Sequence, residues 1–222
     1  MSSKKSICFS IPCYNEKENI VPMAQRLLAV CEEQLSAYDC TIQFIDNCST
    51  DGTRDLLRGL CAKYPRVRAI LNARNFPETS GYYGMTQAVA DATIAIPCDF
   101  QVSLDMVPKM VHEWENGAKI VCLVKKTSEE NSLMWGIRQL FYKLSNQFSD
   151  TEVIRNYSGN GLYDRSFLDI CRKIDDPVVT FCTMVVQLGY NIVKMPYEEK
   201  KRRKGRSKNN VFSLLQTAIM RF

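Results

Sequence analysis

Acidic side chains stand directly after three apolar runs of the sequence, where they could do chemistry together. Glu16 follows the first run, Asp46 the second and Asp99 the fourth. In open α/β sheets, ligands bind outside the carboxyl ends of the strands, so residues that follow the strands of one sheet meet at one edge. Oxygen ligands gathered there could hold a divalent cation and, through it, a nucleotide diphosphate. For Ser49 and Asp51, capping of the next helix is the leading structural alternative.

Four polar segments define this predicted edge, and glycine is nearly absent from them. They are Pro12-Cys13-Tyr14-Asn15-Glu16, Asp46-Asn47-Cys48-Ser49-Thr50-Asp51-Gly52, the segment 72–75 and Asp99-Phe100-Gln101. The first glycine of the chain is Gly52, so neither G-x-G-x-x-G nor G-x-x-x-x-G-K-[ST] follows the first strand. This argues against a dinucleotide-binding dehydrogenase and against a P-loop nucleotidase. Tyr14 remains available to stack on a base.

Alternating apolar and amphipathic segments predict the elements that position these groups. Strands are expected at 6–12, 41–45, 67–71, 94–97, 119–124, 157–163 and 191–196. Helices are expected at 18–35, 53–64, 80–91, 106–116, 132–147, 165–174 and 178–188. This βαβ series predicts one α/β domain with a mostly parallel central sheet, right-handed crossovers and flanking helices.

The positive charge of the chain is concentrated in one short run near its end. The 222 residues carry 29 Lys and Arg against 24 Asp and Glu, and 198–208 alone holds seven basic and two acidic residues. The rest is formally neutral, so a nucleic-acid-binding face is not expected, whereas a local contact with anions or a membrane is. The next segment, 211–222, has apolar residues at helical spacing and predicts an amphipathic helix on a membrane surface; packing on the core is the alternative.

Cysteine and histidine usage narrows the compartment and the chemistry. Ten cysteines without a C-x-x-C pair predict reduced, mostly buried thiols in a cytosolic protein. His112 is the single histidine, so a metal site made of several histidines is excluded. It is expected to be an idle surface residue. No stretch reaches the roughly 18 consecutive apolar residues that span a bilayer, so no transmembrane helix is expected in this chain.

Five segments, taken in order, resemble the motifs of family 2 glycosyltransferases over 6–222. The closest subgroup is that of dolichyl-phosphate mannose synthases and bactoprenol glucosyltransferases. The matching segments are Pro12-Cys13-Tyr14-Asn15-Glu16, Ile45-Asp46-Asn47-Cys48-Ser49-Thr50-Asp51-Gly52-Thr53, Ala73-Arg74-Asn75-Phe76, Asp99-Phe100-Gln101 and Arg202-Arg203-Lys204-Gly205-Arg206-Ser207-Lys208. The resemblance implies a GT-A (Rossmann-like) catalytic domain at 1–197, followed by a basic loop and an amphipathic, juxtamembrane-type helix at 198–222.

The resemblance also implies a reaction and a set of partners. It implies inverting transfer of a hexose from a UDP- or GDP-hexose to a polyprenyl phosphate, by a peripheral protein at the cytoplasmic face of a membrane. Asp99 and Gln101 would hold Mg²⁺ or Mn²⁺, and together with Arg202 they are the expected catalytic residues. Residues expected around the nucleotide are Pro12, Tyr14, Glu16, Asp46 (accepting from the base imide), Asn75, Arg202, Ser207 and Lys208. Lys125 and Arg138 would bind the acceptor phosphate, with ordinary exposed basic residues as the alternative.

Three departures from the family pattern bear on the acceptor and on the metal. The first acid of the family's D-x-D motif is Pro97 here, so the expected metal site has one anionic ligand fewer. Asn47 replaces a second acid after the second strand, and 158–163 lacks the acid and the arginine of G-D-F-R-L. A hydroxyl acceptor would need a general base, whereas a phosphate is already anionic. The sequence therefore favours a phosphate acceptor; a glycan hydroxyl acceptor and a non-catalytic protein that binds nucleotide sugar are the alternatives.

Overall fold

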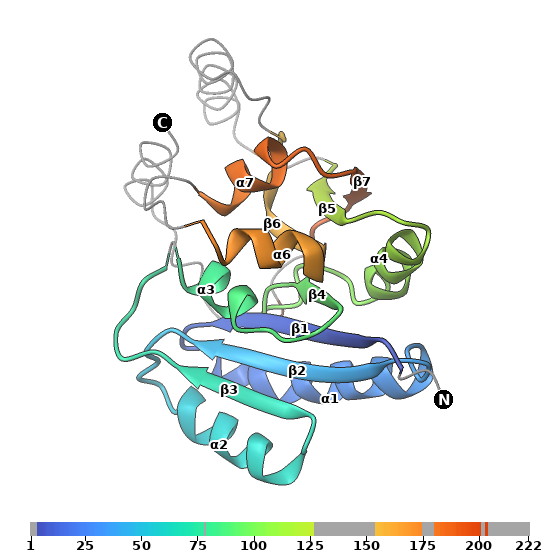
Figure 1. Ribbon diagram of the computed structural model, residues 1–222. Helices are drawn as coiled ribbons and strands as arrows, with labels where there is room; N and C mark the ends of the chain where they lie inside the picture. Colours follow the sequence, from blue (N-terminus) through green and yellow to red (C-terminus); the bar gives the residue numbers. More distant parts are fainter. Residues whose placement is uncertain (1–3, 78, 127–153, 175–179, 201–202, 204–222) are drawn as a thin grey trace.

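A seven-stranded sheet forms the centre of the structure, a computed structural model that describes residues 4–77, 79–126, 154–174, 180–200 and 203 (Figure 1). The strands lie in the order β3-β2-β1-β4-β6-β5-β7. Their bounds are β1 Ser6–Cys13, β2 Asp39–Asp46, β3 Val67–Leu71, β4 Ala92–Ala95, β5 Ile120–Lys125, β6 Tyr157–Asp164 and β7 Ile192–Tyr197. Strand β6 runs antiparallel to its neighbours β4 and β5, and every other pair in the sheet is parallel. Six strands therefore have their carboxyl ends at one edge.

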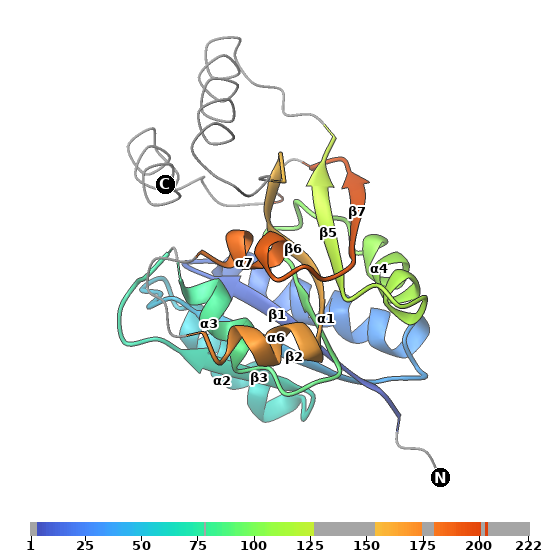
Figure 2. The same ribbon diagram turned by 45° about the horizontal axis from the view of Figure 1, so that its top comes forward.

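Helices cover both faces of the sheet. They are α1 Lys17–Glu33, α2 Thr53–Lys63, α3 Ser80–Thr86, α4 Met106–Glu115, α6 Arg165–Cys171 and α7 Phe181–Gln187. Buried side chains of α1, α2 and α4 form one core cluster with the inward residues of β1 and β2. Those of α3, α6 and α7 form a second cluster, and these three helices stand together in front of the strands (Figure 2). The mixed α/β sheet with helices on both faces confirms the predicted fold class.

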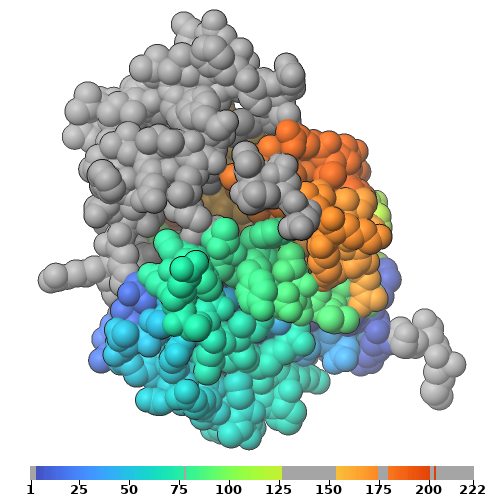
Figure 3. All heavy atoms as spheres, turned by 60° about the vertical axis from the view of Figure 1, so that its left-hand side comes forward, coloured from blue at the N-terminus to red at the C-terminus, as the bar shows by residue number. Residues whose placement is uncertain are grey.

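Helix α3 ends earlier than its sequence pattern predicts. The expected helix 80–91 stops at Thr86, because Ala88 and Ala90 are drawn into the core and the chain turns toward β4. Asp91 then accepts hydrogen bonds from the backbone N–H and the hydroxyl of Ser6, both at 2.8 Å. On the neighbouring helix, the Cys171 carbonyl accepts a hydrogen bond from Tyr82 at 2.9 Å, which joins α6 to α3 on the face seen in Figure 3.

The other predicted elements are found within a few residues, with two exceptions. The expected helices 132–147 and 211–222 lie outside the described residues. All ten cysteines lie in the described part; none forms a disulfide and seven are buried, which confirms that they are mostly buried thiols. His112 is exposed, as predicted. Within the described part of the chain, none of the helices has the length and apolarity needed to cross a bilayer. The domain boundary at 197/198 stays a prediction.

Candidate functional site

The strand order changes direction beside β1, which fixes where a ligand can bind. The chain runs outward from β1 to β2 and β3, and then returns to place β4 on the other side of β1. Loops after β1 and β4 therefore lead in opposite directions, and in open α/β sheets ligands bind at such a point, outside the carboxyl ends of the strands. Tyr14 and Glu16, which follow β1, and Asp99, which follows β4, all belong to this edge. The sequence-predicted site coincides with the topological switch point.

Loops after β1 and β2 are tied together by a short hydrogen-bond network. Asn15 has a φ of 53°, a conformation that asparagine adopts more readily than most residues. Its backbone N–H donates to the hydroxyl of Ser49 at 2.8 Å, and its side-chain oxygen accepts from the N–H of Thr50 at 2.8 Å. The Thr53 hydroxyl accepts from the N–H of Glu16 at 3.0 Å. These bonds fix the loops after β1 and β2 relative to each other.

Neither residue expected to cap α2 is its N-cap, which is Gly52, but Asp51 binds the first N–H of the helix. Asp51 accepts from both the N–H and the hydroxyl of Thr53, at 3.0 and 2.6 Å, at the start of α2. Burial tends to raise the pKa of Asp51, but the hydrogen bonds from Thr53 and from the N–H of Lys17 outweigh it and hold that pKa below its usual value. Ser49 instead uses its hydroxyl to accept from Asn15. Asp51 therefore has a structural role.

Asp46 is wholly buried at the end of β2 and is held by two groups. The Nε of Arg54 donates to its Oδ2 at 2.6 Å, and the N–H of Ser49 donates to both oxygens, at 3.1 and 3.3 Å. Arg54 also donates to the carbonyl of Asn72, so one guanidinium joins the loops after β2 and β3. The pKa of the adjacent Cys13 is raised well above its usual value by burial, which keeps this thiol neutral. In this structure Asp46 is an anchor of the edge, and its expected contact with a base stays a prediction.

Asn47 replaces an acid of the family pattern, and the structure shows what the amide does. Its side-chain nitrogen donates to the side-chain oxygen of Asn75, and its own oxygen accepts from the N–H of Phe76 at 2.9 Å. A carboxylate at position 47 could accept from Phe76 but could not donate to Asn75. The substitution thus organises the loop after β3 and holds Asn75, which is exposed and was expected to contact the nucleotide.

The turn after β4 carries the predicted metal ligands in a strained conformation. Asp99 is only 2% exposed, and one of its oxygens accepts from the N–H of Gln101 at 3.0 Å. Between them, Phe100 has a φ of 64°, which is rare for a bulky side chain and is characteristic of functional sites. Carboxylate and amide oxygens are the hard donors that Mg²⁺ prefers, and Mg²⁺ commonly binds through one or two protein ligands plus substrate phosphates. Asp99 and Gln101 fit that pattern, although the described residues contain no group of three acidic, cysteine or histidine ligands.

The chain after β7 lies across this turn and brings positive charge to it. The N–H of Lys200 donates to the carbonyl of Gln101 at 3.0 Å, and the N–H of Arg203 donates to that of Asp99 at 3.3 Å. The Arg203 guanidinium lies 5.4 Å from the centre of the Phe100 ring, a cation–π contact. Arg202 itself lies outside the described residues, but its neighbours place the start of the basic run at the predicted metal site.

A second group of polar residues gathers where β5 and β7 end. Lys125 is the last residue of β5, and its ammonium forms an ion pair with Glu199. Tyr197, the last residue of β7, is buried; burial and then the charge of Glu199 raise its pKa to about 12. The hydrogen bond from Asn160 of β6 lowers the pKa of the same hydroxyl, and the charge of Asp99 raises it. Glu199 is followed directly by Lys200, whose N–H binds the carbonyl of Gln101, so Lys125 is linked through Glu199 to the turn with the predicted metal ligands.

The structure gathers most of the predicted site residues and identifies others that the sequence did not. Those gathered at the carboxyl edge are Pro12, Tyr14, Glu16, Asp46, Asn75, Asp99, Gln101 and Lys125. Those outside the described residues are Arg138, Arg202, Ser207 and Lys208. Arg54 and Glu199 were not among the predicted residues, whereas Phe100 and Arg203 lay within the matching segments but were given no role of their own. Glu199 could have been noticed as half of the acidic pair that precedes the basic run; nothing in the sequence distinguishes Arg54 from an ordinary exposed arginine.

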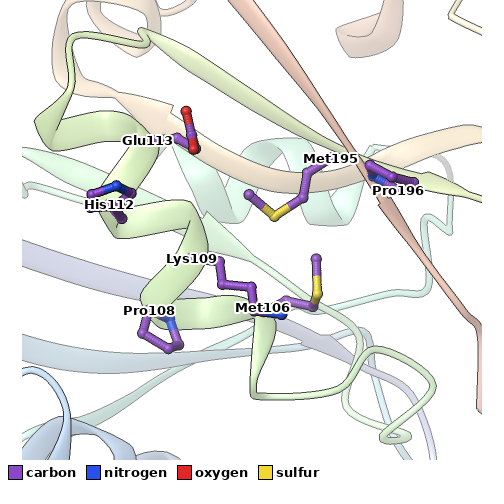
Figure 4. A pocket seen from close by; sticks show the side chains of 7 residues that line it. All are labelled: Met106, Pro108, Lys109, His112, Glu113, Met195 and Pro196. Atoms are coloured by element: carbon purple, nitrogen blue, oxygen red, sulfur yellow. The ribbon is translucent and has the colours of Figure 1, made fainter.

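Two surface hollows of the described part contain none of the predicted residues. One, of about 460 Å³, lies between α4 and β7, where Met106 and Lys109 face Met195 (Figure 4). The other, of about 660 Å³, is lined by residues near the start of β1 and the ends of α4 and β6, including Asp91 and Asp164. The carboxyl edge of the sheet therefore remains the candidate active site.

Comparison with known sequences identifies the family. Residues 8–171 match the family model of Glycosyl transferase family 2. The chain belongs to this family. The bactoprenol glucosyl transferase of Shigella phage SfX is 27% identical over 216 residues, which cover 96% of this chain and 70% of that protein.

Solved structures support the same fold. Mannosyl-3-phosphoglycerate synthase from Rubrobacter xylanophilus superposes with a TM-score of 0.63 at 14% identity, covering 97% of this chain and 71% of that one. The mannosyltransferase PcManGT from Pyrobaculum calidifontis, in complex with GDP-Man and Mn²⁺, gives 0.56 at 15% identity, covering 88% and 56%. The GT-A-like fold of this family 2 glycosyltransferase is therefore established, as the sequence predicted.

Proposed function

We propose that this glycosyltransferase transfers a hexose, with inversion, from a UDP- or GDP-hexose to a polyprenyl phosphate at the cytoplasmic face of a membrane. The observation that carries the proposal is the pairing of two sites at one sheet edge. The Asp99 turn suits a nucleotide diphosphate, and Lys125, linked to that turn through Glu199 and Lys200, suits a second phosphate. The relative named bactoprenol glucosyl transferase supports a polyprenyl acceptor.

The donor would bind between the loops after β1 and β4. Pro12, Tyr14 and Asn75 border the space for the nucleoside, and Asp46 is proposed to accept from the imide of the base. Asp99 and Gln101 would hold Mg²⁺ or Mn²⁺, and the ion would neutralise the diphosphate that leaves. The PcManGT complex with Mn²⁺ supports this choice of ion. Lys200 and Arg203 add positive charge at the same turn, where Arg202, Ser207 and Lys208 are proposed to complete the contacts with the phosphates.

The proposed acceptor, a phosphate, does not require a general base. The β6 segment that faces this edge carries Ser158, Gly159 and Asn160 and no acid. A phosphate oxygen is already a nucleophile: it would attack the anomeric carbon and form a new C–O bond while the bond to the diphosphate breaks. The nucleoside diphosphate leaves with the electron pair of that bond. Lys125, with Arg138, is proposed to orient the attacking phosphate.

Membrane attachment is proposed to come from the end of the chain. Seven basic residues at 198–208 would attract anionic lipid by roughly 1 kcal/mol for each cation near the surface, and the expected helix 211–222 would add apolar contact. In this proposal, 1–197 is the catalytic domain and 198–222 connects its donor site to the membrane.

The role of Asp99 gives a direct test of the donor site. Calorimetric titrations with UDP, GDP and their sugars, each with Mn²⁺ and with EDTA, identify the donor and its dependence on metal. Asp99→Ala should lose turnover and the gain in affinity due to Mn²⁺ while remaining folded. Asp105→Ala, a change at an exposed acid a few residues further along, is the control and should behave as wild type. Full activity in EDTA, together with an active Asp99→Ala protein, would contradict the proposed site.

A further inference from the structure

Two lysine–glutamate pairs join the end of β5 to the chain after β7, and they differ in burial. Lys125 pairs with Glu199, and these side chains are 26% and 29% exposed. Lys126 pairs with Glu198 at 3.6 Å, and these side chains are 53% and 83% exposed. Exposed pairs of the second kind contribute little, because water and salt screen them. The first pair is less exposed than the second, and it lies at the proposed acceptor site.

Glu199 links the proposed acceptor site to the proposed donor site. The next residue, Lys200, is hydrogen-bonded through its N–H to Gln101 of the donor turn at 3.0 Å. On the other side, the preceding strand is fixed to β5 by a 3.0 Å hydrogen bond from the N–H of Lys126 to the carbonyl of Tyr197. Both anchors hold the Glu199 carboxylate on the ammonium of Lys125. The cation proposed to bind acceptor phosphate thus already has an anionic ligand from its own chain.

We propose that Glu199 is an internal substitute for the acceptor phosphate, which binds Lys125 until a phosphate monoester displaces it. This inference rests on the proposed function. A phosphate monoester carries a charge of about −1.5 to −2 near pH 7 and three acceptor oxygens, whereas a carboxylate carries one charge and two oxygens. The monoester can therefore replace Glu199 on Lys125, and a neutral hydroxyl cannot. Glu199 thereby restricts the site to strongly anionic acceptors.

The same competition favours release of the product. Transfer of the sugar converts the phosphate from a monoester into a diester, which keeps one negative charge and loses an anionic oxygen. The diester and the Glu199 carboxylate then carry equal charge, so the carboxylate, which is tethered beside Lys125, can return to it. The carboxylate lowers the affinity of both esters by the same factor, and the diester, which Lys125 attracts less strongly, is the one that it then displaces.

Glu199→Gln removes the competing charge and keeps the shape of the side chain. Titration with a short-chain isoprenyl phosphate monoester, and with its glycosyl diester, should show tighter binding of both by the same factor, about threefold to tenfold, because each ligand displaces the same carboxylate from Lys125. Glu198→Gln is the matched control and should change neither affinity by more than about twofold. Adding Lys125→Gln to Glu199→Gln should abolish the effect.

The outcomes separate this inference from the proposed function. Wild-type protein that binds the monoester, combined with a Glu199→Gln variant that binds it no more tightly, overturns the role of Glu199 and leaves the proposed acceptor in place. Loss of turnover in Glu199→Gln with unchanged monoester binding would make Glu199 a general base and would also overturn the inference. Absence of monoester binding in wild type, with normal binding of the nucleotide sugar, would overturn both the inference and the proposed acceptor.

Discussion

Replacing Arg54 with methionine should destabilise the protein through Asp46. Methionine keeps much of the apolar stem of Arg54 but removes the 2.6 Å hydrogen bond and the charge that Asp46 faces. Asp46 has no solvent exposure, so it would be left as a buried charge held only by the N–H of Ser49. Breaking a buried pair in this way costs about 3–5 kcal/mol. Because Arg54 is 27% exposed, we expect water to reduce this loss to about 2–4 kcal/mol.

Urea denaturation followed by circular dichroism measures this loss directly. For a chain of this length the same change should lower the melting temperature by roughly 5–12 °C. Arg58→Met is the control. Arg58 lies one turn after Arg54 on α2 and pairs with Asp55, and these side chains are 62% and 82% exposed. The free energy of unfolding should therefore fall by no more than about 0.5 kcal/mol in this variant. Adding Asp46→Asn to Arg54→Met should recover part of the stability, since the buried charge is gone. An Arg54→Met protein as stable as Arg58→Met would refute the anchoring role of this pair.

Three further changes test other parts of the structure. Gly84→Ala would place a Cβ 2.2 Å from the buried side chain of Ile45, so stability in urea should fall by about 1–3 kcal/mol; an unchanged midpoint would contradict this packing. The pKa of Asp91 is held below its usual value, first by the N–H of Ser6 and then by its hydroxyl, so its contribution to stability is present above pH of about 4 and is lost as pH falls through the folded-state pKa. Asp91→Asn should therefore make the acid limb of a stability–pH curve shallower, and an identical limb would argue against this interaction. Arg203→Gln should weaken binding of the nucleoside diphosphate by about threefold to tenfold, and more so at low salt; equal affinity in calorimetry would remove Arg203 from the donor site.

Local patterns in the sequence were sufficient to predict most elements of the fold. Apolar residues at helical or strand spacing reflect contacts that each element must make, so α1, α2, α4 and the parallel strands could be predicted from single segments. The end of α3 could not be predicted, because it depends on Ser6, which is distant in sequence and binds Asp91. Helix propensity around 88–90 is overruled by burial of the alanines there.

The position of β6 within the sheet could not be predicted from the sequence pattern. The strand itself was predicted, but its antiparallel insertion between β4 and β5 depends on long-range pairing, in which Gly161 faces Ala95 on one side and Cys122 on the other. A Cβ at Gly161 would lie 2.1 Å from the carbonyl oxygen of Val121, so the close approach requires glycine. The sequence does not show which of the ten glycines is required by a close backbone contact.

The candidate site could be predicted where topology alone decides position. Asp99 and Asn75 were predicted because residues after parallel strands must meet at one edge. The partners of those residues could not be predicted, since pairing depends on side-chain directions in the folded chain. Arg54 meets Asp46 beneath the surface, and Glu199 meets Lys125 only because β7 lies beside β5.

The central claim is that the acceptor is a phosphate, and a comparison of two lipids tests it most directly. The protein is incubated with the nucleotide sugar that calorimetry selects, radiolabelled in the hexose, and with either a polyprenyl phosphate or the polyprenol of equal chain length. Our account predicts that label enters the organic phase only with the phosphate, as a glycosyl phosphodiester. Lys125→Gln should raise the KM for that lipid and leave the KM for the donor unchanged. Equal labelling of the polyprenol, or label that is found only as free sugar with both lipids, would contradict the account.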